Sequence, residues 1–209
     1  RVGVIGTGAS ANQVVPAISP IVEELVVYQR SAHWMMAHPK YGKFLEGIEK
    51  ALFQVPMYRE WHRFSEGWKF GDGVTPMVTV DPDWPHPERS VNAANDRFRA
   101  QLTEYLETQV GDRPDLMAKC LPNFPPYGKR LIVDNGWYQA LRRPNVRVET
   151  SPIAAIDQAG VRTRAGHADL VAVADIYAAG EAPIAGVSAE ALVASIGKSG
   201  HKGARKLIS

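Results

Sequence analysis

The stretch that decides the fold is VGVIGTGASA at residues 2–11. Its apolar start, 2–5, predicts a buried β-strand, and the small residues that follow predict a tight turn. A helix is expected next, over roughly 10–18, and a second β-rich run covers 24–28. The first thirty residues therefore indicate one β-α-β unit, the building block of a parallel sheet.

The turn fits the pattern G-x-G-x-x-G/A, in which each small residue has a physical role. Gly6 permits the tight turn, Gly8 lets the backbone approach a pyrophosphate closely, and Ala11 lets the helix pack near the strand. The free N–H groups at the start of the helix favour phosphate. The alternative is a glycine-containing turn of an unrelated α/β protein. The predicted contacts to a dinucleotide are Gly6, Thr7, Gly8, Ala9, Ser10, Ala11 and Gln13.

The end of the second strand indicates which dinucleotide is bound. Sites for NAD usually carry Asp or Glu there, to bind the ribose 2′-hydroxyl. Here the residues are Gln29-Arg30-Ser31, so no carboxylate repels a 2′-phosphate. The guanidinium of Arg30 and the hydroxyl of Ser31 suit that phosphate. We therefore expect NADP(H) rather than NAD(H), with a solvated surface arginine as the alternative for Arg30.

The rest of the chain completes an α/β fold, namely a Rossmann-like NADP-binding domain with a parallel sheet and a mainly helical insertion. We assign 1–31 and 110–209 to the Rossmann-like domain, with 169–209 as an atypical tail, and 32–109 to the insertion. Helices are expected at 41–53, 55–68, 91–109, 136–142 and 188–198, a loop at 71–90, and strands at 130–133, 146–149, 153–156, 160–164 and 170–177.

Composition excludes several classes of protein. The net charge is only +2, and the 24 lysines and arginines are spread along the chain, which argues against nucleic-acid binding. No run approaches the roughly 20 apolar residues of a membrane span. The single cysteine, Cys120, favours a reducing, cytoplasmic setting, and the six histidines lack metal-ligand spacing, so no metal is expected. Ser10 does not stand in the G-x-S-x-G pattern of a hydrolase nucleophile.

Two blocks of sequence together resemble the Baeyer–Villiger monooxygenases. The first covers 2–34, and the second is LPNFPPYGKRLIVDNGWYQALRRPNVRVET at 121–150. The second block is the more specific, because Pro-Pro-x-Gly-Lys-Arg followed by Asp-Asn-Gly-Trp-Tyr is not a general fold signature. The spacer between the blocks resembles the helical insertion of the 4-hydroxyacetophenone monooxygenase branch. The resemblance covers about 1–165 and implies FAD as a second cofactor and a ketone as substrate.

The resemblance also implies roles for two further residues. Lys129 matches a lysine that reaches the 2′-phosphate, and Arg130 matches the catalytic arginine of the family. That arginine offsets negative charge on the flavin and holds the nicotinamide beside it. A permanently protonated guanidinium can do so without donating a proton. Without the surrounding motif, Lys129-Arg130 would be interpreted as a basic pair at the surface.

The chain also departs from the family. The flavin-binding GxGxxG, the F-x-G-x-x-x-H fingerprint and the usual Ala-Thr-Gly-Phe are missing, and no leader precedes the strand at 2–5. We therefore expect a fragment of a longer protein without most of its FAD domain. Residues 169–202 instead resemble the C-terminal domain of UDP-N-acetylmuramate–alanine ligase, which indicates a chimera or mis-assembled sequence.

Several functions remain open at this stage. The chain is expected to be the NADPH-binding part of a ketone-oxidising monooxygenase and to be inactive alone. A module that only binds NADPH, a fragment of a heteroatom-oxidising flavin monooxygenase, and a Mur-ligase-related fragment are the alternatives. Four tryptophans of the insertion are expected to pack in its core, or else to line a hydrophobic substrate cleft: Trp34, Trp61, Trp68 and Trp84.

Overall fold

The fold is built on a three-stranded parallel sheet. The computed structural model describes residues 1–38, 41–157, 160–165 and 167–168. Strand β2 (Leu25–Tyr28) lies between β1 (Val2–Ile5) and β5 (Val146–Glu149). All four residues of β2 are buried, as expected for a central strand of a parallel sheet. The expected Rossmann-type α/β architecture is therefore present.

The two faces of β2 are covered by different layers. Leu25 and Val27 belong to the main core, together with residues of the flanking helices α1 (Ala9–Ile18) and α7 (Trp137–Leu141). Val26 and Tyr28 alternate to the other face, as successive strand residues must, and pack with Val161. Val161 lies on an antiparallel sheet of β6 (Ile153–Asp157), β7 (Gly160–Thr163) and β8 (His167–Ala168).

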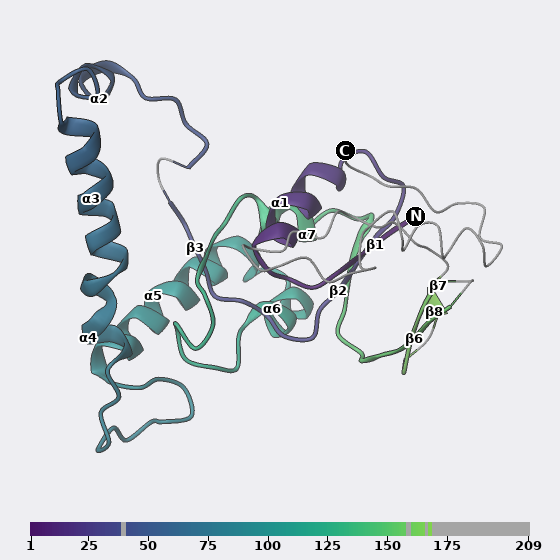
Figure 1. The fold of residues 1–209 in the computed structure, drawn as a ribbon. Helices are drawn as coiled ribbons and strands as arrows, with labels where there is room; N and C mark the ends of the chain where they lie inside the picture. The colour runs from purple at the N-terminus through teal and green to yellow at the C-terminus, as the bar shows by residue number, and fades with distance from the viewer. Residues whose placement is uncertain (39–40, 158–159, 166, 169–209) are drawn as a thin grey trace, which may run out of the picture.

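Two more helices close the core on the helical side (Figure 1). Helix α5 (Ala93–Val110) begins at Asn92, whose side chain accepts a hydrogen bond from the backbone N–H of Asn95. Helix α6 (Pro114–Cys120) begins with proline, which suits a first helical position. Both helices contribute buried side chains to the main core. Its largest fully buried members are Trp137, Leu25, Leu106, Leu141, Val15, Val27 and Val110.

A short second pair of parallel strands joins two distant parts of the chain. Strand β3 (Met35–Met36) pairs with β4 (Ile132–Val133). The pairing is extended at both ends, since the N–H of Ile132 donates to the carbonyl of Trp34 and that of Asp134 to the carbonyl of Met36. Asp134 then accepts a 2.7 Å hydrogen bond from the backbone N–H of Trp137 and so stabilises the start of α7.

The remaining helices extend away from this core. Helix α2 (Gly47–Leu52), helix α3 (Tyr58–Phe70), a short 3-10 helix η1 (Asp72–Val74) and helix α4 (Thr75–Val78) follow one another. Figure 1 shows α3 standing apart from α5, α6 and α7. None of these four helices contains a buried residue.

Four tryptophans, Trp34, Trp61, Trp68 and Trp84, were expected to pack in the core of the insertion. This expectation is wrong for two of them. Trp61 and Trp68 on α3 are 60% and 56% exposed, because no described element covers their side of the helix. Trp34 is only 2% exposed, and its indole N–H donates to the carbonyl of Phe124. Trp84 is partly buried and donates to the hydroxyl of Ser90.

Several element boundaries also differ from those expected. Residues 41–46 are not helical, and Gly42 and Gly47 take left-handed backbone conformations there. The expected loop at 71–90 contains η1 and α4, and the expected strand at 130–133 begins only at Ile132. Helix α6 and strands β3 and β8 were not anticipated, because such short elements show no clear hydrophobic period.

Part of the sequence lies outside the described residues. This part includes the strand expected at 170–177, the helix expected at 188–198 and the ligase-like tail. Within the described ranges, no helix combines the length and the hydrophobicity needed to cross a bilayer.

Candidate functional site

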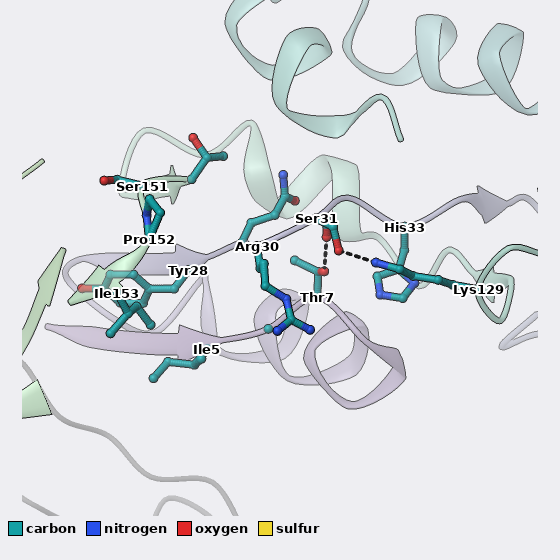
Figure 2. A pocket seen from close by; sticks show the side chains of 13 residues that line it. Ile5, Thr7, Tyr28, Arg30, Ser31, His33, Lys129, Ser151, Pro152 and Ile153 are labelled. Atoms are coloured by element: carbon teal, nitrogen blue, oxygen red, sulfur yellow. Dashed lines mark hydrogen bonds between the residues drawn. The ribbon is translucent and has the colours of Figure 1, made fainter. Parts of the chain in front are cut away.

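A pocket of about 720 Å³ opens at the carboxyl ends of the parallel strands (Figure 2). Ligands of open α/β sheets bind at this edge. The pocket wall comes from four separate segments of the chain. The end of β1 and the turn after it contribute Ile5, Gly6 and Thr7, and the end of β2 and the residues after it contribute Tyr28, Gln29, Arg30, Ser31 and His33. The other lining residues are Lys129 and, between β5 and the start of β6, Thr150, Ser151, Pro152 and Ile153.

The glycine turn forms one side of this pocket and leaves open space. Gly6 has φ of +104°, a conformation that glycine adopts without strain, and its N–H donates to the carbonyl of Tyr28. A Cβ atom added to Gly6 or Gly8 would meet no atom of the described residues within 4 Å. Helix α1 starts at Ala9, so its free N–H groups begin at this turn. The turn can therefore accept a phosphate group beside its backbone.

Cationic and hydroxyl side chains gather at the end of β2. The ammonium Nζ of Lys129 donates a 2.6 Å hydrogen bond to the hydroxyl Oγ of Ser31. The hydroxyl of Thr7 donates to the carbonyl of Ser31 at 2.8 Å, which ties the glycine turn to the same residue. Arg30 lines the same pocket and is exposed. Two positive charges thus face one pocket, and none of the described residues that line it carries a carboxylate.

His33 lies beside Lys129 and was missed as a pocket residue. Its Nδ1 is buried and has no hydrogen-bond partner among the residues that the structure describes. Burial, and then the positive charge of Lys129, lower the pKa of the imidazole, while a hydrogen bond with the backbone of Arg130 works in the opposite direction. The ring is therefore neutral near pH 7. It can donate or accept one hydrogen bond without adding to the charge of the pocket.

The structure brings together only some of the predicted residues. Gly6, Thr7, Arg30, Ser31 and Lys129 all line the pocket. The rest of the glycine pattern follows along the start of α1, where Gly8 is the N-cap residue, Ala9 and Ser10 are exposed, and Ala11 is buried in the core.

Two predicted residues lie apart from the pocket wall. Gln13 is exposed, and its side-chain amide donates to the carbonyl of Ala9 at 3.4 Å. Arg130 is exposed and is not among the lining residues, although it directly follows Lys129. Across the described residues, no three His, Cys, Asp or Glu side chains are grouped as metal ligands.

The segment after β5 was also missed, although a signal for it exists. Thr150 to Ile153 carry no recognisable motif. Their place in the pocket follows from the strand order, since β5 pairs in parallel with β2 and ends at the same edge. A predicted strand order, rather than a motif, would have identified them.

Comparisons with known proteins agree on one kind of enzyme. No family model matches the chain. An uncharacterized monooxygenase of Sinorhizobium fredii is 45% identical over 186 residues, which cover 85% of this chain and 27% of that protein. An FAD-binding monooxygenase of Aspergillus niger is 32% identical over 168 residues, covering 78% of this chain and 25% of that protein. A Baeyer–Villiger monooxygenase of Streptomyces coelicolor is 30% identical over 156 residues, which cover 75% of this chain and 28% of that protein.

Solved structures give the same result. A steroid monooxygenase bound to NADP is 27% identical, with a TM-score of 0.57, over 82% of this chain and 37% of that one. An open structure of cyclohexanone monooxygenase, 24% identical, shares the fold with a TM-score of 0.60 over 82% of this chain and 38% of that one. The chain spans only about a quarter of the length of the curated relatives named above. Over about four fifths of its own length, the chain is therefore similar to the Baeyer–Villiger and FAD-binding monooxygenases.

Proposed function

We propose that this chain forms the NADPH-binding part of an FAD-dependent monooxygenase of Baeyer–Villiger type, which oxidises ketones to esters or lactones. The observation that carries the proposal is the meeting of Arg30, Ser31 and Lys129 in one pocket beside the glycine turn. Several curated relatives are themselves Baeyer–Villiger monooxygenases.

The pocket suits the phosphate groups of NADPH. The open space at Gly6 and Gly8 fits a pyrophosphate, which the N–H groups at the start of α1 attract. Arg30 and Lys129 would hold the 2′-phosphate, and the Ser31 hydroxyl would add a hydrogen bond to it. Removing any of these three groups should therefore weaken NADPH more than NADH.

We assign Arg130 to the chemistry of the flavin rather than to the nucleotide pocket. Bound FAD supplies the activation of oxygen, which no side chain of this chain can provide. The guanidinium of Arg130 is exposed and permanently charged, so it can offset negative charge at an adjoining flavin without giving up a proton. Since the oxidising group belongs to FAD, the chain alone is proposed to bind NADPH without turnover.

The proposed domain organisation separates the nucleotide-binding segments from the helical insertion. Residues 1–31 and 110–209 would form the nucleotide-binding domain, and 32–109 a helical insertion of the type found in the 4-hydroxyacetophenone monooxygenase branch. Helix α5 packs in the main core, which supports the proposal that the end of this insertion is anchored to the nucleotide-binding domain.

The test is a binding measurement on the purified chain. Calorimetry with NADPH and NADH should give an affinity at least about tenfold higher for NADPH, the gain typical of one charge-assisted contact to phosphate. Added FAD should wash out and should not support NADPH oxidation. Equal affinities, or no uptake of either nucleotide, would refute the nucleotide assignment. Retained flavin with turnover would refute the inactivity of the isolated chain.

A further inference from the structure

We propose that Asn12 is a positioning residue that sets the place of Lys129 and thereby the preference for the phosphorylated coenzyme, an inference that rests on the proposed function. Asn12 lies on α1, directly after the glycine turn, and is only 3% exposed. Its side-chain Nδ2 donates a 2.7 Å hydrogen bond to the carbonyl of Val133, which is 121 residues away in the sequence.

This hydrogen bond connects α1 to a strand pair that is separate from the three-stranded sheet. Lys129 precedes strand β4, and β4 pairs with β3 rather than with the parallel sheet of β1, β2 and β5. The register of that sheet therefore fixes Arg30, at the end of β2, whereas the parallel register of β3 with β4 brings Lys129 beside Ser31. The bond from Asn12 ties β4 to the helix that starts at the glycine turn.

Three hydrogen bonds form a closed circuit around the phosphate end of the pocket. Thr7 of the turn bonds to the carbonyl of Ser31, and Lys129 bonds to the hydroxyl of Ser31 (Figure 2). The chain then continues from Lys129 through β4 to Val133. The carbonyl of Val133 accepts the hydrogen bond from Asn12 on α1, and α1 begins at the turn. Removal of the Asn12 bond opens the circuit on the Lys129 side and leaves the Thr7–Ser31 side intact.

The chemistry of Asn12 favours placement over stability. Its Oδ1 is also buried, and no described residue forms a hydrogen bond with it. A buried, unsatisfied oxygen destabilises the folded state, and asparagine forms helices less readily than alanine or leucine. A helix selected only for stability would carry an apolar residue at this position, so the amide group is best explained by its bond to β4.

Asn145 offers a matched control. Its Nδ2 also bonds to α1 and the turn after it, at the carbonyls of Ser19 and Val22, with distances of 2.9 and 2.8 Å. It lies just before β5, at the amino ends of the strands, and does not line the pocket. Asn145→Ala therefore removes a similar anchor of α1 at the end of the sheet opposite the pocket.

The experiment compares NADPH and NADH affinities in the full chain and in Asn12→Ala, Asn12→Leu and Asn145→Ala. Asn12→Leu keeps the branch at Cγ and raises the helix propensity, so it remains informative if Asn12→Ala folds poorly. Both Asn12 variants should lose about tenfold in NADPH affinity and less than about twofold in NADH affinity, since one phosphate contact is weakened. Asn145→Ala should lower the melting temperature and leave the preference unchanged.

The outcomes separate the two proposals. A folded Asn12→Leu with the full preference for NADPH overturns the positioning role, and so does an equal loss of preference in Asn145→Ala. A wild-type chain without any preference overturns the proposed function itself.

Discussion

Ser31 and Lys129 are separated by 98 residues in the sequence, yet the Lys129 ammonium donates a 2.6 Å hydrogen bond to the Ser31 hydroxyl. The ammonium also lies 4.7 Å from the ring centroid of Phe124, a cation–π contact that restrains it from the other side. The two residues should therefore act as a unit on the 2′-phosphate.

A double-mutant cycle of Ser31→Ala and Lys129→Met measures this coupling. Each single change should weaken NADPH binding, and the double variant should lose less than the sum by about 0.5–1.5 kcal/mol, as for residues in one hydrogen-bond network. Calorimetric affinities for NADPH give the four corners of the cycle, and NADH serves as the reference ligand. Strict additivity would show that Ser31 and Lys129 act independently.

Arg30→Ala should reduce NADPH affinity by roughly 10–100-fold, because a charge-assisted contact to phosphate contributes about 1.5–3 kcal/mol. NADH affinity should change little, since the proposed role of Arg30 is to contact only the 2′-phosphate. Arg59→Ala is the control, since Arg59 is an exposed arginine on α3, outside the pocket wall. An equal loss for both nucleotides would mean that Arg30 contributes general affinity rather than selection.

Arg130→Ala should leave NADPH binding by this chain within about twofold of the wild type, because an exposed side chain outside the pocket wall contributes little. In an enzyme that also binds FAD, the same change should abolish oxygenation. Titration of the purified variant with NADPH checks the first part. A large loss of affinity would move Arg130 into the nucleotide pocket.

The stability of the folded chain should fall in mild acid because of His33. Burial and Lys129 lower the pKa of His33 from 6.5, so the unfolded chain takes up a proton that the folded chain refuses. The contribution of His33 to the free energy of unfolding is then fully present above about pH 6.5 and decreases as the pH falls toward the folded-state pKa. Urea unfolding of the wild type and of His33→Gln over this range tests the claim, and the variant should show the weaker dependence.

The thiol of Cys120 should be inert in the native chain. Burial raises its pKa to about 12, and the side chain packs in the main core. Since the thiolate is the reactive form, a thiol reagent should label the native protein at least about a thousandfold more slowly than the urea-unfolded protein. Cys120 is the only cysteine, so the signal is unambiguous. Fast labelling of the native chain would show that α6 does not stay packed.

Local patterns predicted the part of the site that lies on the first β-α-β unit. The glycine turn and Arg30 lie within thirty residues, where strand, turn and helix follow one another directly, and Gly6, Thr7 and Arg30 line one pocket. Lys129 was assigned to the nucleotide site by resemblance, because no local pattern in residues 125–131 indicates a contact with Ser31. The structure supplies the missing step through the pairing of β3 with β4.

What could not be predicted depends on contacts between distant segments. A strand of two residues such as β3 has no period to detect, and a buried amide such as Asn12 looks in the sequence like any polar helix residue. Helix α3 shows the opposite failure. Its aromatic spacing is that of a core helix, but burial requires a facing surface, which the helical period alone does not reveal.

The exposed aromatic residues of α3 should make the purified chain self-associate. Trp61, Phe64 and Trp68 recur at helical spacing and are each more than half exposed. Such a stripe attracts apolar dyes, detergent and other copies of the same molecule. Light scattering should therefore rise with protein concentration, and exchanging Trp61 and Trp68 for glutamine should suppress it without disturbing the nucleotide pocket.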